Sequence, residues 1–295
     1  MMIKVKQTSL YVLNKLESLA SRGDPSELDL YVHSVYERTI NLMLDNQLLA
    51  LQIQDSPVSP ISVILPINEA EIHAIGVHDG DAVTLRSNNL TVGKATISFD
   101  APTCIYDGYL IKHNHKEDLK STVKHMIENT NRGGFSFLTD PAGAPDDFVL
   151  SYAKDKLTDA VSSLKSGDTA SSGNALTSLI GLGSGLTPGG DDFLTGMLST
   201  FAALPARFNH KLMESVRAAI TDNLDNTNEI SRAFIKCALA SQFSVPVITL
   251  YDELCTGAEA VDKLTKDFLA IGHSSGIDTL TGIWWSLEYL TRKAD

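Results

Sequence analysis

Two adjacent carboxylates, Asp191 and Asp192, lie at the end of a loop that is rich in glycine. The loop reads GLGSGLTPGGDDFLTG over residues 181–196, and an apolar segment lies on each side of it. Glycine adopts positive φ values at little cost and lets backbone N–H groups approach a bound group closely. Pro188 presets φ ahead of a new helix, whose N-terminus carries partial positive charge. We expect this loop to bind an anion.

We expect Asp191 or Asp192 to be the N-cap of this helix. The simplest alternative to anion binding is an ordinary turn between two helices, with Asp191 as the cap. The loop is not a P-loop, because no lysine follows its glycines. It is not a dinucleotide-binding fingerprint either, because a helix precedes it and no βαβ unit surrounds it. The paired aspartates, which could also hold a divalent ion such as Mg²⁺, and the adjacent Thr187 favour ligand binding over a plain turn.

A second glycine- and serine-rich bend, IGHSSGIDTLTG, covers residues 271–282 and again precedes a helix. The helix start offers unpaired backbone N–H groups, and the side chains of His273, Ser274 and Ser275 add further hydrogen-bond donors. The alternative is a helix stop at Gly272 followed by Ser275 as the next N-cap. Gly282 lies inside the helix, where glycine costs ~1 kcal/mol relative to alanine, so we expect close packing or a nearby ligand there.

The stretch NTNEISR, residues 226–232, starts a third helix, with Asn226, Thr227 or Asn228 as its cap. Arg232 lies in the first turn, and its planar fork suits a carboxylate or phosphate, although a solvated surface arginine is the alternative. His113 and His115 have the spacing of a metal-binding pair, but no third ligand is visible, so we expect solvated histidines.

Composition excludes some functions. The chain has 295 residues, enough for one or two domains, and a formal net charge of −12, with no cluster of basic residues that would bind nucleic acid. Its 3 cysteines are widely spaced, which is typical of a reducing compartment. No run of 18 uncharged apolar residues occurs, so we expect a soluble, cytoplasmic protein without membrane association.

The hydrophobic patterns predict a β-rich N-terminal half and a helical C-terminal half, an α+β fold. We predict a first helix at 7–20, followed by a small barrel or sandwich. Its predicted strands lie at 38–44, 48–53, 61–65, 80–86 and 90–97, and a helix capped by Asn68 lies at 68–75. Helices follow at 117–129 and 146–164, then a polar linker at 165–173, then helices at 190–204, 210–224, 228–242, 246–255, 258–271 and 276–292. We predict domains at 1–115 and 116–295, and no internal repeat.

Together, the motifs GLGSGLTPGGDDFLTG, NTNEISR and GHSSGIDTLTG resemble those of the AllH-like family of oxamate carbamoyltransferase subunits. The resemblance is strong over residues 174–290, whereas over 1–150 it rests on the β-rich layout alone. It implies phosphorolysis of oxalurate to oxamate and carbamoyl phosphate in anaerobic allantoin breakdown, together with partner subunits.

Both substrates of that reaction are anions, and preorganised N–H donors stabilise the charge that develops on the carbamoyl oxygen. We predict Asp191 and Asp192 as catalytic carboxylates, one of which accepts from the carbamoyl NH₂, and Arg232 as a partner of the substrate carboxylate. The other predicted substrate-binding residues come from the same three stretches: Gly183, Ser184, Gly185, Thr187, Gly190, Asn228, Ser231, His273, Ser274, Ser275 and Gly276.

Two other functions fit the same residues. A Mg-dependent phosphotransferase would use the glycine loop for a nucleotide and the aspartate pair for the metal. A non-catalytic structural subunit of a multiprotein complex would use the loops as an interface, and the chemistry would take place in a partner.

Overall fold

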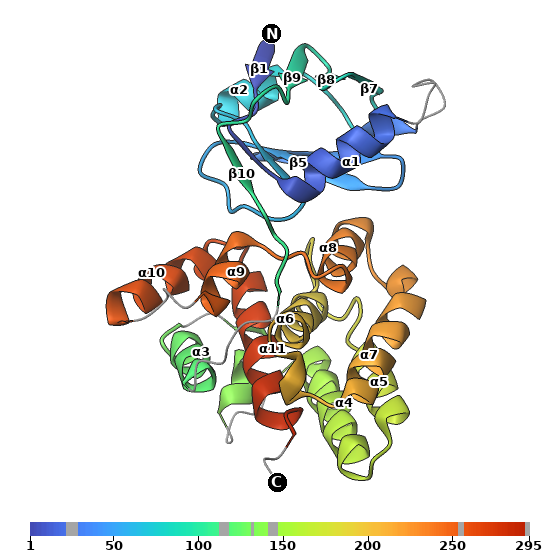
Figure 1. The fold of residues 1–295 in the computed structure, drawn as a ribbon, viewed down its shortest axis with the longest axis vertical. Helices are drawn as coiled ribbons and strands as arrows, with labels where there is room; N and C mark the ends of the chain where they lie inside the picture. Colours follow the sequence, from blue (N-terminus) through green and yellow to red (C-terminus); the bar gives the residue numbers. More distant parts are fainter. Residues whose placement is uncertain (22–28, 112–117, 131–132, 141–146, 253–256, 293–295) are drawn as a thin grey trace. The chain divides into compact units, whose positions relative to one another are not determined.

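The computed structural model describes residues 1–21, 29–111, 118–130, 133–140, 147–252 and 257–292. The chain divides into two compact units, Met1–Tyr109 and Leu110–Asp295 (Figure 1). The first contains β-sheets with short helices and the second is helical, which confirms the predicted α+β class. The predicted boundary at residue 115 lies outside the described residues, as do His113, His115 and the predicted helix start at Asp146.

The larger sheet of the N-terminal unit has six strands in the order β10-β2-β6-β5-β4-β3. Their bounds are Cys104–Tyr106 (β10), Gln7–Ser9 (β2), Ser62–Ile64 (β6), Leu48–Gln52 (β5), Thr39–Leu44 (β4) and Leu30–Val35 (β3). The predicted hairpin of β4 and β5 is confirmed, with Asp45 and Asn46 at positive φ in its turn.

The smaller sheet has four strands in the order β1-β9-β8-β7. They are Met2–Lys4 (β1), Ala95–Ser98 (β9), Asn89–Val92 (β8) and Val83–Arg86 (β7). The prediction of one strand over 90–97 was wrong, because the chain reverses between β8 and β9. Gly93 allows this turn: its φ is +52°, and a Cβ there would lie 2.5 Å from Val77 Cγ1.

Two helices complete the N-terminal unit. Helix α1 (Leu10–Ala20) starts three residues later than predicted, because residues 7–9 form β2 and Ser9 caps the helix. Helix α2 (Glu69–Ala74) has the predicted Asn68 cap: the Asn68 side chain accepts from the Glu71 N–H, and the Glu71 carboxylate accepts from the Asn68 N–H. One apolar cluster joins α1 to both sheets, including Val12, Leu42, Val63, Leu90 and Ile97, so the unit has a single core.

The C-terminal unit is built from helices and short 3₁₀ turns. Their bounds are Leu119–Glu128 (α3), Gly134–Thr139 (η2), Phe148–Lys165 (α4), Thr169–Thr177 (α5), Gly189–Ala203 (α6), Pro205–Arg207 (η3), His210–Asp222 (α7), Leu224–Asn226 (η4), Glu229–Leu239 (α8), Val245–Tyr251 (α9), Ala258–Leu269 (α10) and Ser275–Tyr289 (α11). The predicted linker at 165–173 was partly wrong, since Asp168 accepts from the Ser171 N–H and starts α5 there.

Helices α6 and α11 pack along each other at the centre of this unit (Figure 1). Glycines make the close approach possible: a Cβ at Gly196 would overlap the Thr279 carbonyl, and one at Gly282 would overlap the Phe193 carbonyl. The expected close packing at Gly282 is therefore confirmed. Trp284 and Trp285 of α11 are buried in the core. This pairing brings the start of α6 close to the start of α11.

No helix in the described part of the chain is long and apolar enough to span a membrane.

Candidate functional site

The two glycine-containing bends meet at the starts of α6 and α11. The hydroxyls of Thr187 and Ser275 lie 2.9 Å apart, although 88 positions separate them in the sequence. Thr187 lies directly before the N-cap of α6 and Ser275 is the first residue of α11, so the contact joins the first bend to the start of the second helix. Two helix N-termini and their bends therefore form one local cluster within the C-terminal unit.

The first bend is exposed over Gly183, Ser184, Gly185 and Leu186. Gly183 and Gly185 have φ values of +122° and +99°, which side chains rarely adopt. No described residue accepts a hydrogen bond from the N–H groups of Gly183, Ser184 or Gly185. These backbone donors are therefore open to a ligand.

Helix α6 begins differently from the predicted arrangement. Pro188 occupies the N-cap, so the expectation that Asp191 or Asp192 caps the helix was wrong; both lie inside its first turn. The N–H of Gly190 donates to the Leu182 carbonyl over 2.9 Å. A Cβ at Gly190 would overlap the carbonyl of Leu179. Close backbone packing thus explains Gly190 without a ligand.

Asp191 is buried and braces the first bend from within. Its Oδ1 accepts from the Gly181 N–H at 2.8 Å, and its Oδ2 accepts from the Thr227 hydroxyl at 2.5 Å. Burial raises the pKa of this carboxyl, while the Thr227 and Gly181 hydrogen bonds oppose the rise. Because both of its oxygens have protein partners, Asp191 links the bend to the segment before α8.

Asp192 has a different environment one residue further on. Its Oδ2 is buried without a hydrogen-bond partner. Burial raises its pKa well above the ordinary value; the hydroxyls of Ser275 and Thr187 oppose this rise, and the negative charge of Asp278 adds to it. Asp192 is thus the carboxyl that faces the contact between the two bends.

Asp278, in the first turn of α11, is a site residue that sequence reasoning missed. Only 1% of it is exposed, its Oδ1 accepts from the Phe135 N–H at 2.7 Å, and its Oδ2 has no partner. Burial raises its pKa to about 7, against the lowering effect of the Phe135 N–H and the Ser274 hydroxyl. Near neutral pH this carboxyl is therefore partly protonated.

A short repeat identifies Asp278. The first eight residues of α6 are GGDDFLTG and those of α11 are SGIDTLTG, so both read x-G-x-D-x-L-T-G with Asp192 and Asp278 in the same place. The close contacts are reciprocal as well: Gly196 faces Thr279, and Gly282 faces the residue equivalent to Thr279, which is Phe193. The two helix starts are thus related by a local twofold axis. The prediction of no internal repeat was wrong at this scale.

The start of α8 holds the first bend in place. Asn228 caps the helix by accepting from the buried Ser231 N–H at 3.0 Å, and its Nδ2 donates to the Leu186 carbonyl at 3.1 Å. Arg232 donates to the carbonyls of Leu224 and Thr227 at 3.0 and 3.2 Å. These contacts make Arg232 a brace for Thr227, and its pairing with a substrate carboxylate stays a prediction.

The second bend is more closed than the first. Ser274 is the N-cap of α11, so the alternative of Ser275 as the cap was wrong. The Gly276 N–H donates to the Ile271 carbonyl at 3.2 Å, and a Cβ there would overlap the Phe268 carbonyl. His273 is exposed. Packing explains Gly276, while the hydroxyls of Ser275 and Ser274 interact with the carboxyls of Asp192 and Asp278, respectively.

The described residues contain no group of three or more His, Cys, Asp or Glu side chains that could hold a metal ion. Both oxygens of Asp191 already accept hydrogen bonds from the protein. The described part of the chain therefore supplies no further ligand of these types for Mg²⁺ at Asp191 and Asp192.

The fold and the candidate site define a class of protein: an α+β chain in which the starts of two packed helices, α6 and α11, form a candidate site beside backbone N–H groups that have no acceptor in the described part of the chain. Residues 179–287 match the family model described as oxamate carbamoyltransferase subunit AllH, and residues 4–104 match the AllH family N-terminal domain. The chain belongs to the AllH family and is thus a carbamoyltransferase subunit. The N-terminal match supports the family where the sequence offered only a layout. No solved structure matches the chain.

Proposed function

We propose that this chain is a subunit of a cytoplasmic enzyme that converts oxalurate and phosphate to oxamate and carbamoyl phosphate in allantoin breakdown. A phosphate oxygen attacks the carbamoyl carbon of oxalurate, and the bond from that carbon to the amide nitrogen breaks. The nitrogen takes up a proton and leaves as oxamate. Partner subunits complete the enzyme, as the family description of a subunit implies.

The observation that carries this proposal is the contact between Thr187 and Ser275. Two anions must meet for the reaction, and each helix start offers N–H donors and a partial positive charge. We assign phosphate to the open N–H groups of Gly183, Ser184 and Gly185, and the oxalurate carboxylate to the second bend. Holding both in attack geometry can contribute roughly 7 kcal/mol to catalysis.

Asp192 is the better candidate than Asp191 for contact with the carbamoyl NH₂. Asp192 has an unpartnered oxygen, whereas both oxygens of Asp191 bind protein donors. Asp278 lies beside the same cluster and holds a proton over part of the neutral pH range. In this assignment Asp191 positions the loop, and Asp192 orients the substrate.

Two variants of the assembled enzyme test the assignment. Gly185→Val places a branched residue where the backbone φ is +99° and where a Cβ meets no atom within 4 Å. Gly167→Val does the same at an exposed position with a φ of +84°. We expect Gly185→Val to lower kcat/KM by about 100-fold, because backbone donors that stabilise developing charge are worth that much. Gly167→Val carries a similar backbone strain and is expected to keep full activity.

Asp192→Asn in the same assembly is expected to lower kcat/KM by at least about tenfold, because one acceptor oxygen becomes a donor. Full activity of both Gly185→Val and Asp192→Asn would contradict the assignment of the site. Calorimetry with phosphate and with oxalurate then separates two forms of the proposal. Binding by the isolated chain supports a site within this subunit, and binding only in the assembly supports a site shared with a partner.

A further inference from the structure

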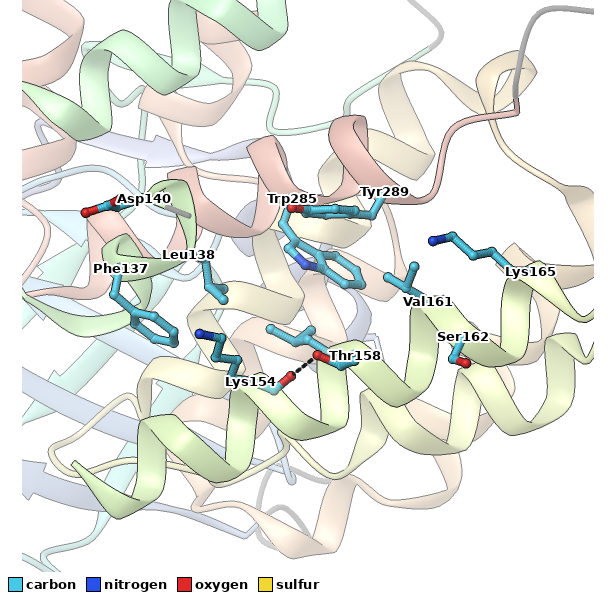
Figure 2. Close-up of a pocket in the computed structure, with 11 residues that line it drawn as sticks. Phe137, Leu138, Asp140, Lys154, Thr158, Val161, Ser162, Lys165, Trp285 and Tyr289 are labelled. Carbon is cyan, nitrogen blue, oxygen red and sulfur yellow. Dashed lines mark hydrogen bonds between the residues drawn. The ribbon is translucent and has the colours of Figure 1, made fainter. Parts of the chain in front are cut away.

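A separate pocket of about 410 Å³ lies in the helical unit between η2, α4 and the C-terminal half of α11 (Figure 2). Its aromatic lining comes from Phe137, Trp285 and Tyr289. Lys154 and Lys165 line it from α4, and Asp140 is the one acidic side chain among its lining residues. None of these residues belongs to the cluster at Thr187 and Ser275, so the proposed carbamoyl transfer does not use this pocket.

The polar groups of the pocket favour a ligand that accepts hydrogen bonds. Trp285 is only 3% exposed, and no described residue accepts a hydrogen bond from its indole N–H. Figure 2 shows the indole ring of Trp285 facing the pocket, beside the ring of Tyr289. A buried tryptophan usually finds a partner for its N–H, so an acceptor supplied by a ligand would complete this contact.

The charge of the pocket favours an acid. Lys154 and Lys165 are eleven residues apart, about 16 Å along α4, and both ammonium groups border the lining (Figure 2). Lys165 has no carboxylate partner among the described residues. The chain as a whole carries a net charge of −12, whereas the ammonium group of Lys165 gives this pocket a positive charge without a carboxylate partner in the described part of the chain.

We propose that this pocket binds a planar aromatic or heterocyclic acid, whose ring packs against the aromatic lining of Phe137, Trp285 and Tyr289 and whose acidic group pairs with Lys165. The size agrees, because small-molecule pockets of about 300–1,000 Å³ typically combine apolar walls with a few placed polar groups. The ligand is a second, independent one for this chain and binds whether or not the carbamoyl-transfer site is occupied.

Anilinonaphthalene sulfonate, an acid with a planar naphthalene ring, is the probe. Titration into the full chain is expected to give one saturable site, with probe fluorescence rising as tryptophan fluorescence falls, because both tryptophans lie in α11 and Trp285 lines the pocket. Lys165→Ala is expected to raise the Kd up to about fivefold, the value of one partly exposed charge pair. Thr158 is exposed and lines the pocket, so the larger side chain of Thr158→Phe is expected to fill the pocket and to abolish saturable binding of the probe.

Lys156→Ala is the matched control, because Lys156 lies on the same helix and pairs with Asp159 instead of lining the pocket. It is expected to leave the Kd unchanged. An unsulfonated anilinonaphthalene tests the charge: it is expected to bind more weakly and to be indifferent to Lys165→Ala. Equal Kd values for wild type, Lys165→Ala and Thr158→Phe, or probe binding without tryptophan quenching, would overturn the proposal.

Discussion

The starts of α6 and α11 share a sequence pattern but differ in what precedes them. Before α6, an exposed bend carries backbone donors that no described residue uses, whereas before α11 a short bend is closed by its own hydrogen bonds. The third helical residue also differs: Asp191 braces the first bend, and the equivalent Ile277 packs in the core. The shared residues thus pair the two helices, and the differing residues leave the exposed backbone donors of Gly183, Ser184 and Gly185 on the first bend.

Substitutions at the contact between α6 and α11 are expected to have the largest effect, and they test whether the two helices are related by the local twofold axis. Replacing Gly196 or Gly282 with Val places a side chain on a backbone carbonyl that cannot move without separating the helices. We expect each variant to lose about 4 kcal/mol of unfolding free energy, above the usual range for overpacking. Urea unfolding followed by tryptophan fluorescence reports on this unit, because both tryptophans lie in α11.

Gly257→Val is the control for backbone strain without overlap, since a Cβ at Gly257 meets nothing within 4 Å, whereas its φ of +89° lies in the region that side chains rarely adopt. It is expected to lose about 1 kcal/mol, the cost of backbone strain alone. Because the contacts are reciprocal, the losses at Gly196 and Gly282 are expected to be similar. A large loss at one glycine and a small one at the other would contradict the local twofold relation.

Asp278 supplies a pH-dependent test of the same comparison. Its pKa rises from 3.8 in the unfolded chain to about 7 in the folded one, so the folded state binds the extra proton between these values. Stability attributable to this group therefore falls as pH rises from about 4 to 7 and is constant above 7. Above pH 7, ionisation of buried Asp278 lowers the free energy of unfolding by at most about 4 kcal/mol. We expect a loss of about 2 kcal/mol, because the surroundings of the carboxylate relax.

Asp278→Asn removes this penalty and keeps an oxygen for the Phe135 N–H. The variant is expected to be more stable than wild type at pH 8.5, with the difference shrinking toward pH 4. Urea midpoints at several pH values measure it. A variant that is equally destabilised at every pH would mean that the Asp278 carboxyl is not the buried, protonated group described here.

Much of the fold could be predicted from local patterns. The hairpin of β4 and β5, the Asn68 cap and most helices of the C-terminal unit follow from period and capping residues alone. The division of 90–97 into two strands could not be predicted, because Gly93 is required by contacts with Val77 from elsewhere in the chain. A local pattern carries no information about such a contact.

The same limit applies to the site. Asp192 was predicted because it follows the glycine loop. Asp278 was missed, although the repeated pattern x-G-x-D-x-L-T-G marks it in the sequence; its contacts with Phe135 and Gly189 come from the tertiary structure alone. Gly190 and Gly276 looked like ligand-binding positions, yet each permits contact with a backbone carbonyl. Glycine supports binding and packing by the same lack of a Cβ, and only the tertiary contacts separate the two.

The most direct test of the central claim is a double-mutant cycle on phosphate affinity in the assembled enzyme, with Thr187→Val and Ser275→Ala. If the contact between the two hydroxyls holds the phosphate-binding first bend in place, either single variant breaks that contact and is expected to raise the phosphate Kd by about fivefold, the value of one hydrogen bond, and the double variant is expected to raise it only slightly more. Independent effects that multiply in the double variant, or an unchanged Kd in either single one, would contradict a single site formed by the two helix starts.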